Sequence, residues 1–69
     1  MVNLQALNIL INDTPGAIEA YATEIGMDPT VARGLAILLI ANDGNLASLS
    51  VNQREHYEKV VLPLLMGDV

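Results

Sequence analysis

The sequence predicts an all-α fold, a compact bundle of about four short helices around a very apolar central helix. Hydrophobic residues make up 52% of the 69 residues, yet there are only two tyrosines and no phenylalanine or tryptophan. The apolar residues are therefore mostly helix formers, and the aromatic residues that favour strands are scarce. Helix-capping residues also recur along the chain. A chain of this length forms one domain, which we expect to span residues 1–69.

The central helix is predicted over residues 29–41. Asp28 can cap it, and Pro29 can occupy its first position. Behind Gly34 comes an unbroken apolar run, residues 35–41. A helix that is apolar on every side cannot lie on a surface. We therefore expect this helix to be surrounded by other parts of the chain or by another chain.

The first helix is predicted over residues 2–11. Apolar residues fall on two of its faces: Leu4, Leu7, Leu10 and Ile11 on one, and Val2, Ala6 and Ile9 on the other. Two interpretations remain open. Both faces are buried by ordinary packing, or one face contacts the core and the other contacts a partner.

The second helix is predicted over residues 15–25, with Thr14 or Asp13 as its cap and Pro15 at its first position. Its apolar stripe consists of Ile18, Tyr21, Ala22 and Ile25. Gly26 is expected to end the helix in a left-handed conformation, which glycine adopts without a steric penalty.

The last helix is predicted to follow Ser50, after a turn at residues 42–45 and one irregular turn at residues 45–49. Ser50 and Gln53 have the spacing of a capping box. The inner stripe of this helix consists of Tyr57, Val60, Val61, Leu64 and Leu65. Two ion pairs are expected on its outer side, Arg54 with Glu58 and Glu55 with Lys59.

Pro63 interrupts the pattern of the last helix. Proline cannot donate a hydrogen bond to the carbonyl of Lys59, and its ring crowds that turn. We expect a kink near Leu62, or a stop followed by one short turn at residues 63–66. Gly67 is expected to end the structure.

The composition excludes several kinds of site. The chain has no cysteine, which excludes disulfides and thiolate metal sites, and its single histidine, His56, leaves little for zinc. No phosphate loop or cofactor motif is present. We therefore expect neither a cofactor nor a metal.

The net charge is −5, and residues 1–32 contain four acidic and no basic residues. An acidic surface repels phosphate groups, so we expect neither nucleic acid nor a membrane as a direct partner. The apolar run is too short to span a bilayer, and the first residues lack a targeting signal. We expect a soluble, cytoplasmic protein whose charge permits a basic protein partner.

One pattern resembles the helix-turn-helix of DNA-binding proteins. The residues that carry it are Tyr21, Ala22, Ile25, Gly26, Met27 and Leu35. The resemblance implies a DNA-reading helix that begins at Asp28. That helix offers one arginine, Arg33, and is too apolar from Leu35 on to lie in a DNA groove. We interpret the pattern as two helices packed across a tight glycine turn, with DNA binding as the alternative.

The most polar run, residues 54–59, contains the only histidine. Asn52 and His56 share a helix face, but no Ser-His-Asp arrangement or metal-ligand spacing appears. We interpret this run as a solvated helix face, with a partner contact as the alternative. Residues 42–45 lack the further oxygen ligands that a calcium loop requires. The sequence thus predicts that the protein is not an enzyme.

The segment from Gln53 to Leu65, QREHYEKVVLPLL, resembles a segment of small uncharacterised bacterial and prophage-type proteins. In those proteins it can precede a cysteine-bearing piece, whereas this chain contains no cysteine. The resemblance implies a bacterial or phage accessory protein and assigns no activity or residue role.

By elimination, the sequence predicts a small acidic protein–protein interaction module that forms a homodimer or binds another protein. Its apolar content exceeds what so short a monomer readily hides, and we expect the excess on the first helix and near Pro63. The candidate contact residues are Leu7, Leu10, Arg54, His56, Tyr57 and Leu64. Two alternatives remain: a helix-turn-helix regulator associated with nucleic acid, and an acidic inhibitor that mimics nucleic acid on a basic protein.

Overall fold

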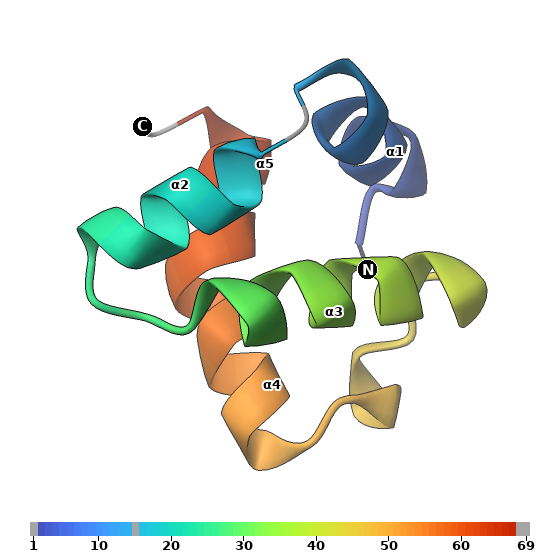
Figure 1. Cartoon of the computed structure of the whole chain (residues 1–69). Coiled ribbons are helices and arrows are strands. Elements are labelled where there is room, and N and C mark those ends of the chain that lie inside the picture. The colour runs from blue at the N-terminus through green and yellow to red at the C-terminus, as the bar shows by residue number, and fades with distance from the viewer. Residues whose placement is uncertain (1, 15, 68–69) are drawn as a thin grey trace.

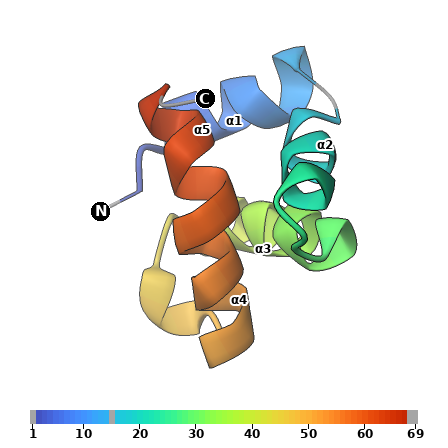
Figure 2. The same cartoon turned by 90° about the vertical axis from the view of Figure 1, so that its left-hand side faces the viewer.

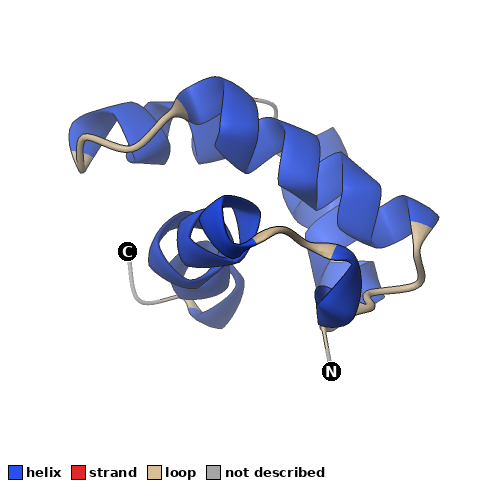
Figure 3. Ribbon diagram, turned by 90° about the horizontal axis from the view of Figure 1, so that it is seen from below, coloured by secondary structure: helices blue, strands red, loops and turns tan. Residues whose placement is uncertain are grey.

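Helices and short connections make up the fold in a computed structural model that describes residues 2–14 and 16–67. The α-helices are α1 (Leu4–Asp13), α2 (Ala17–Glu24), α3 (Pro29–Ala41), α4 (Val51–His56) and α5 (Leu62–Met66). A 3₁₀-helix, η1 (Leu46–Ser48), precedes α4, and a π-helix, η2 (Tyr57–Val61), joins α4 to α5. Since α4, η2 and α5 follow one another without a break, the described residues form a compact globule of four helices with no strand (Figure 3). The predicted all-α fold class is confirmed.

The continuous helix formed by α4, η2 and α5 is a column against which the other helices pack. α3 contacts α4 and η2, α1 contacts α5, and α2 contacts η2. Figure 2 shows the column upright, with α1 across one end and with α2 and α3 on one side. In Figure 1 the column lies behind α2 and α3. The outward sides of these two helices therefore face away from the rest of the molecule.

The core lies where α1, α3 and η2 meet. Its largest fully buried side chains are Leu7, Leu35, Leu39, Val60 and Val61. Truncation of one such leucine to alanine typically destabilises a protein by about 2–5 kcal/mol, because burial and close packing are both lost. We therefore assign these side chains to the stability of the fold.

Two predicted helix caps are confirmed. A carboxylate oxygen of Asp28 accepts hydrogen bonds from the backbone N–H groups of Thr30 and Val31, at 2.9 and 3.4 Å. The Ser50 hydroxyl accepts from the N–H of Gln53 at 3.1 Å, and the N–H of Ser50 donates to Oε1 of Gln53 at 2.9 Å. These bonds satisfy backbone donors that have no partner within their own helix.

The first helix differs from its predicted bounds at both ends. α1 begins at Leu4 and not at residue 2, because the side-chain oxygen of Asn3 accepts from the N–H of Ala6 at 3.1 Å and caps the helix there. It continues to Asp13, two residues beyond the predicted end. The Thr14 hydroxyl then donates to the carbonyl of Leu10 at 2.7 Å, which closes the last turn.

The predicted cap of the second helix is wrong. α2 begins at Ala17, and its cap is Gly16, which has a φ of 87°. Because the Thr14 hydroxyl bonds back to α1, it does not cap α2. The prediction for Pro15 lies outside the described residues. Gly26, with a φ of 78°, adopts the predicted left-handed conformation after α2.

Pro63 does not stop the last helix. The N–H of Leu62 donates to the carbonyl of Tyr57, five residues earlier, where an α-helix would use a carbonyl four residues earlier. This wider turn lets the helix pass the proline, whose nitrogen cannot donate to Lys59. The predicted stop before residues 63–66 is therefore wrong. Gly67, with a φ of 74°, follows the helix as its left-handed cap.

One side of α3 is not covered by the residues that the structure describes. The buried residues of α3 are Ala32, Leu35, Ala36 and Leu39. On the opposite side, Gly34 is exposed, and 50% of the surface of Ile37 is accessible to solvent. Among residues 2–14 and 16–67, the column, α1 and α2 reach only the inner side of this helix. The expectation that it is surrounded by the chain alone is therefore not met, and the alternative, that another chain covers its outer side, stays a prediction.

Two glycines test these packing assignments. A methyl group at Gly34 would meet no heavy atom within 4 Å, so Gly34→Ala should raise the free energy of unfolding by about 0.5–1 kcal/mol through helix propensity.

Gly44 has a φ of +78°, and a methyl group there would lie 3.3 Å from Cβ of Val2. Gly44→Ala should therefore lower the free energy of unfolding by about 1 kcal/mol or more. Urea denaturation measures both changes, and a destabilised Gly34→Ala would contradict the open environment of Gly34.

Candidate functional site

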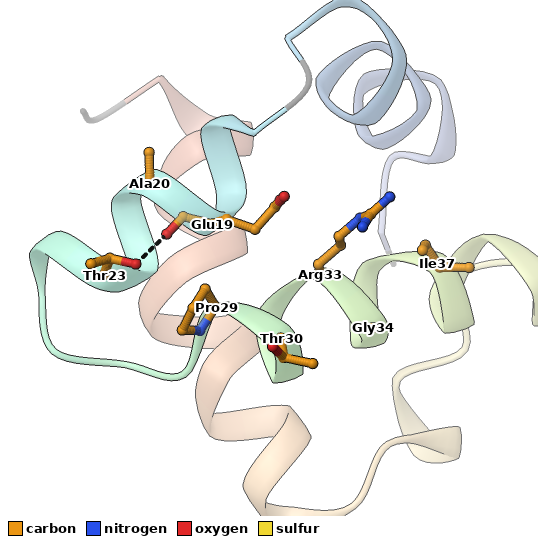
Figure 4. Close-up of a pocket in the computed structure, with 8 residues that line it drawn as sticks. All are labelled: Glu19, Ala20, Thr23, Pro29, Thr30, Arg33, Gly34 and Ile37. Carbon is orange, nitrogen blue, oxygen red and sulfur yellow. Dashed lines mark hydrogen bonds between the residues drawn. The ribbon is translucent and has the colours of Figure 1, made fainter.

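An open groove with a volume of about 840 Å³ runs between α2 and α3 (Figure 4). It is lined by Glu19, Ala20 and Thr23 from α2 and by Pro29, Thr30, Arg33, Gly34 and Ile37 from α3. We refer to it as the α2–α3 groove. It is larger than a neighbouring hollow of about 160 Å³.

The wall formed by α2 is the outer side of an amphipathic helix. Ile18 and Ala22 are buried beneath it, while Ala20 and Thr23 are exposed. The Thr23 hydroxyl donates to the backbone carbonyl of Glu19 at 2.9 Å, as the dashed line in Figure 4 marks. This bond holds the threonine against its own helix, so that its hydroxyl proton is already engaged.

The residues of α3 that line the groove recur at helical spacing. Thr30, Arg33, Gly34 and Ile37 lie three or four residues apart and form one stripe opposite the buried side of the helix. Gly34 adds no side chain to this stripe, and Ala20 adds only a methyl group to the facing wall. The backbone of α3 is consequently open to close approach from outside.

His56 fixes the start of α3 against α4. Its ring is buried, Nε2 accepts from the backbone N–H of Asp28 at 3.2 Å, and Nδ1 lies 2.8 Å from the carbonyl oxygen of Asn52. A neutral ring with its proton on Nδ1 satisfies both contacts. Asp28 in turn caps α3, so this histidine helps to position the α3 wall of the groove.

Charges are unevenly distributed around the groove. Glu19 lies along its α2 wall. Glu24 and Asp28, both exposed, do not line the groove but lie next to its turn end, where α2 ends and α3 begins. Among the described residues, Arg33 forms no ion pair. Figure 4 shows the side chains of Arg33 and Glu19 extending from α3 and α2 into the same region. Both also line a neighbouring hollow of about 160 Å³ toward α1.

The other two basic residues of the chain are already paired on α4 and η2. Arg54 and Glu58 lie 3.9 Å apart, and Lys59 and Glu55 lie 3.5 Å apart, which confirms both predicted pairs. All four side chains are more than half exposed, so each pair contributes little to stability.

The six predicted contact residues do not form one surface. Leu7 is fully buried, and His56 and Tyr57 each retain 6% exposure, while Leu10 and Leu64 are partly buried and Arg54 is exposed. None of the six lines the α2–α3 groove. Leu7, His56 and Tyr57 have too little accessible surface to contact a partner in this conformation.

The interpretation of residues 54–59 as a solvated face is wrong for two of them. His56 and Tyr57 lie on the same side of the column as Val60 and Val61, one turn later, and all four are buried. Arg54, Glu55, Glu58 and Lys59 occupy the other side and are exposed. The run is continuous in sequence, but a helix divides it between core and solvent.

Among the described residues, the two segments expected to carry excess apolar surface hold two of the five exposed large apolar side chains. On α1, Leu7 is buried and Ile9 is the large apolar side chain left half exposed. Near Pro63, Met66 is 65% exposed, whereas Leu64 and Leu65 pack against the core. Sequence reasoning missed the α2–α3 groove. The available signal was the spacing of Thr30, Arg33 and Gly34, which places non-apolar residues along one side of α3.

The predicted packing of two helices across a glycine turn is confirmed. Ala22 and Leu35 are buried where α2 and α3 contact each other, and Gly26 supplies the left-handed turn between them. The exposed side of α3 offers a single cation, Arg33. Readers of DNA need several basic contacts to phosphate and polar contacts to base edges.

Several other features were sought in residues 2–14 and 16–67. These residues contain no group of three or more His, Asp or Glu side chains arranged to hold a metal ion. No helix in this part of the chain has the length and apolar character needed to cross a membrane. Comparison of the chain with protein-family models, curated proteins and solved structures finds no significant match. The resemblance of residues 53–65 to bacterial and prophage-type proteins therefore stays a prediction.

Substitutions at His56 test its link to α3. His56→Leu should lower the free energy of unfolding by about 1–3 kcal/mol, because the N–H of Asp28 loses its acceptor. His56→Gln places an amide oxygen near the position of Nε2 and should recover part of this loss. Urea denaturation compares the two variants, and equal stabilities would contradict the proposed role of the hydrogen bond. Nitrogen-15 NMR of the wild-type ring should report the proton on Nδ1.

Ionisation of Tyr57 should lower the stability of the protein at alkaline pH. Burial raises the pKa of its phenol above the ordinary value, and the neighbouring Glu58 carboxylate raises it further. Because the unfolded chain ionises first, the free energy of unfolding should be unaffected by Tyr57 below about pH 10 and should fall as the pH rises above that value. Tyr57→Phe should reduce this fall, as measured by urea denaturation across the alkaline range. Equal slopes in the two proteins would exclude the effect.

Proposed function

We propose that this chain is a small acidic protein–protein interaction module that binds an α-helix of a partner protein in the α2–α3 groove. The observation that carries the proposal is the uncovered side of α3. There Ile37 is half exposed beside Gly34, in an open groove of about 840 Å³. Helices that dock in grooves of this kind place apolar side chains at helical spacing against such a surface.

The small residues of the groove suit an approaching helix. Packed helices have axes about 8–10 Å apart, and the distance depends on the side chains at the contact. Gly34 has no side chain, and Ala20 has only a methyl group on the facing wall. A large apolar side chain of a partner would fit between them and would also cover Ile37. Burial of apolar surface contributes about 25 cal/mol for each Å² removed from water.

A glycine at position 34 also has a stability cost that no internal contact explains. Glycine in the middle of a helix is less stable than alanine by about 1 kcal/mol. In this chain, a methyl group there would meet no heavy atom within 4 Å. Close approach of another backbone is a reason for glycine at such a position.

Catalysis has no support at this site. The polar side chains of the groove belong to Glu19, Thr23, Thr30 and Arg33. The Thr23 hydroxyl donates to a backbone carbonyl, and no hydroxyl is hydrogen-bonded to a side-chain base among the described residues. An adjacent base is one of the usual ways in which a hydroxyl nucleophile is activated. We therefore propose a binding role without catalytic activity.

A helix-turn-helix regulator is the second candidate, because α2 and α3 pack across a glycine turn. Its weakness is the single cation on the exposed side of α3 and the acidic residues at the turn. A gel shift at low salt is the direct test, since phosphate contacts are strongest there. The third candidate, an acidic inhibitor that mimics nucleic acid, is supported by the net charge alone.

Titration of the isotope-labelled chain with synthetic helical peptides tests the proposed function. One peptide carries leucine at every third or fourth position with glutamine elsewhere, and the control peptide has the leucines replaced by glutamine. The leucine peptide should shift the backbone amide signals of Ala20, Thr23, Thr30, Gly34 and Ile37, and the control peptide should not. Absence of shifts with the leucine peptide would refute the proposal.

A matched pair of variants locates the binding. Gly34→Leu fills the groove at an exposed position where an added Cβ would meet no heavy atom within 4 Å, so the fold should persist. Ala47→Leu places a leucine at an exposed position on η1, outside the groove, and so adds one carbon fewer than Gly34→Leu does. Binding should be lost in the first variant and retained in the second. Equal binding by both would place the contact elsewhere.

A further inference from the structure

We infer that the partner helix of the α2–α3 groove is amphipathic and basic, with lysine or arginine beside its apolar stripe at the end that lies over the α2–α3 turn. This inference rests on the proposed function and adds the chemistry and the direction of the bound helix. It follows from charges whose positions the structure fixes.

Negative charge gathers at one end of the groove. Glu24 is the last residue of α2, and Asp28 is the cap of α3, so both lie at the turn that joins the two walls. Both residues are exposed. In Figure 4, Thr23 and Pro29 mark this end of the groove. A bound helix would bring its side chains over this end, where positive charge is favoured.

Among the described residues, no lysine or arginine side chain forms an ion pair with the carboxylates at the turn end of the groove. Arg54 and Lys59 pair with Glu58 and Glu55 on the column. Arg33 lies farther along α3, toward Ile37, as Figure 4 shows. Among the described residues, Glu24 and Asp28 therefore have no ion-pair partner.

The same charges disfavour a second copy of the chain as the occupant. Each copy carries a net charge of −5. If α3 of a second copy were the occupant, its exposed side would present one arginine, Arg33, and its N-terminal cap would be Asp28. Two such grooves would bring like charges together, which costs association free energy. A basic partner helix has the opposite effect.

Arg33 makes the charge farther along the groove different from the charge at its turn end. It stands beyond the acidic end, beside Gly34 and near Ile37. Glu19 extends into the same region, so the two charges there are of opposite sign. The preference for basic residues is therefore confined to the turn end of the groove, where Glu24 and Asp28 lie.

Three peptides with the same leucine stripe test the charge preference. Their flanking positions at one end carry lysine, glutamine or glutamate, and each binds the full chain in a fluorescence anisotropy titration. The lysine peptide should bind about tenfold more tightly than the glutamate peptide, with the glutamine peptide between them. Added salt should weaken the lysine peptide most. Equal affinities for the three peptides would overturn the inference.

Two charge variants locate the preference. Glu24→Gln removes one charge at the turn end, and Glu58→Gln removes one charge on the column, so the net charge is the same in both. The lysine peptide should bind several-fold more weakly to Glu24→Gln and unchanged to Glu58→Gln. Equal weakening would mean that net charge alone acts, and the inference would fail.

The outcomes separate this inference from the proposed function. If the glutamine peptide binds in the groove and lysine adds nothing, the proposed function stands and the basic partner is wrong. If no leucine peptide binds, the proposed function itself fails. Light scattering of the unliganded chain covers the remaining case: a dimer that Gly34→Leu abolishes and Ala47→Leu preserves would make a second copy the occupant and overturn the inference.

Discussion

The length of the chain limits how much of α3 can be covered, and the rest of the structure depends on this constraint. α3 is apolar around most of its circumference, but the column, α1 and α2 meet only one side of it. Ala32, Leu35, Ala36 and Leu39 fill that side. A domain of this size buries a smaller fraction of its surface than a larger one. The α2–α3 groove is therefore produced by the same packing that forms the core.

Contacts within the chain also hold the walls of the groove in place. Asp28 caps α3, Gly26 turns the chain between the helices, and the buried ring of His56 ties the start of α3 to α4. Each of these constraints acts on backbone atoms near the acidic end of the groove. A site that is ordered in advance loses less conformational entropy when it binds. The acidic end of the groove thus lies at a connection that is fixed by these three features.

Local signals in the sequence predicted the local structure well. The bounds of α3, the caps at Asp28 and Ser50 and the left-handed Gly26 all depend on residues close together in the chain. The groove could not be predicted in this way, because it depends on which side of α3 the column covers. Leu7 shows the same limit: helical spacing placed it on an apolar face, but only tertiary packing decides between core and surface. For His56, the sequence contained no sign of its bond to Asp28, twenty-eight residues away.

The π turn at Tyr57–Val61 acts like one extra residue inserted into an otherwise regular helix. An α-helix rotates by about 100° per residue, so everything after the turn is rotated by about one such step relative to α4. This rotation determines which side of α5 meets α1 and allows Leu64 and Leu65 to pack against the core. The side chains of α5 are consequently rotated about the helix axis relative to those of α4, and the turn that causes this rotation lies next to Pro63. An insertion or deletion there would change the direction of α5 while leaving its length almost unchanged.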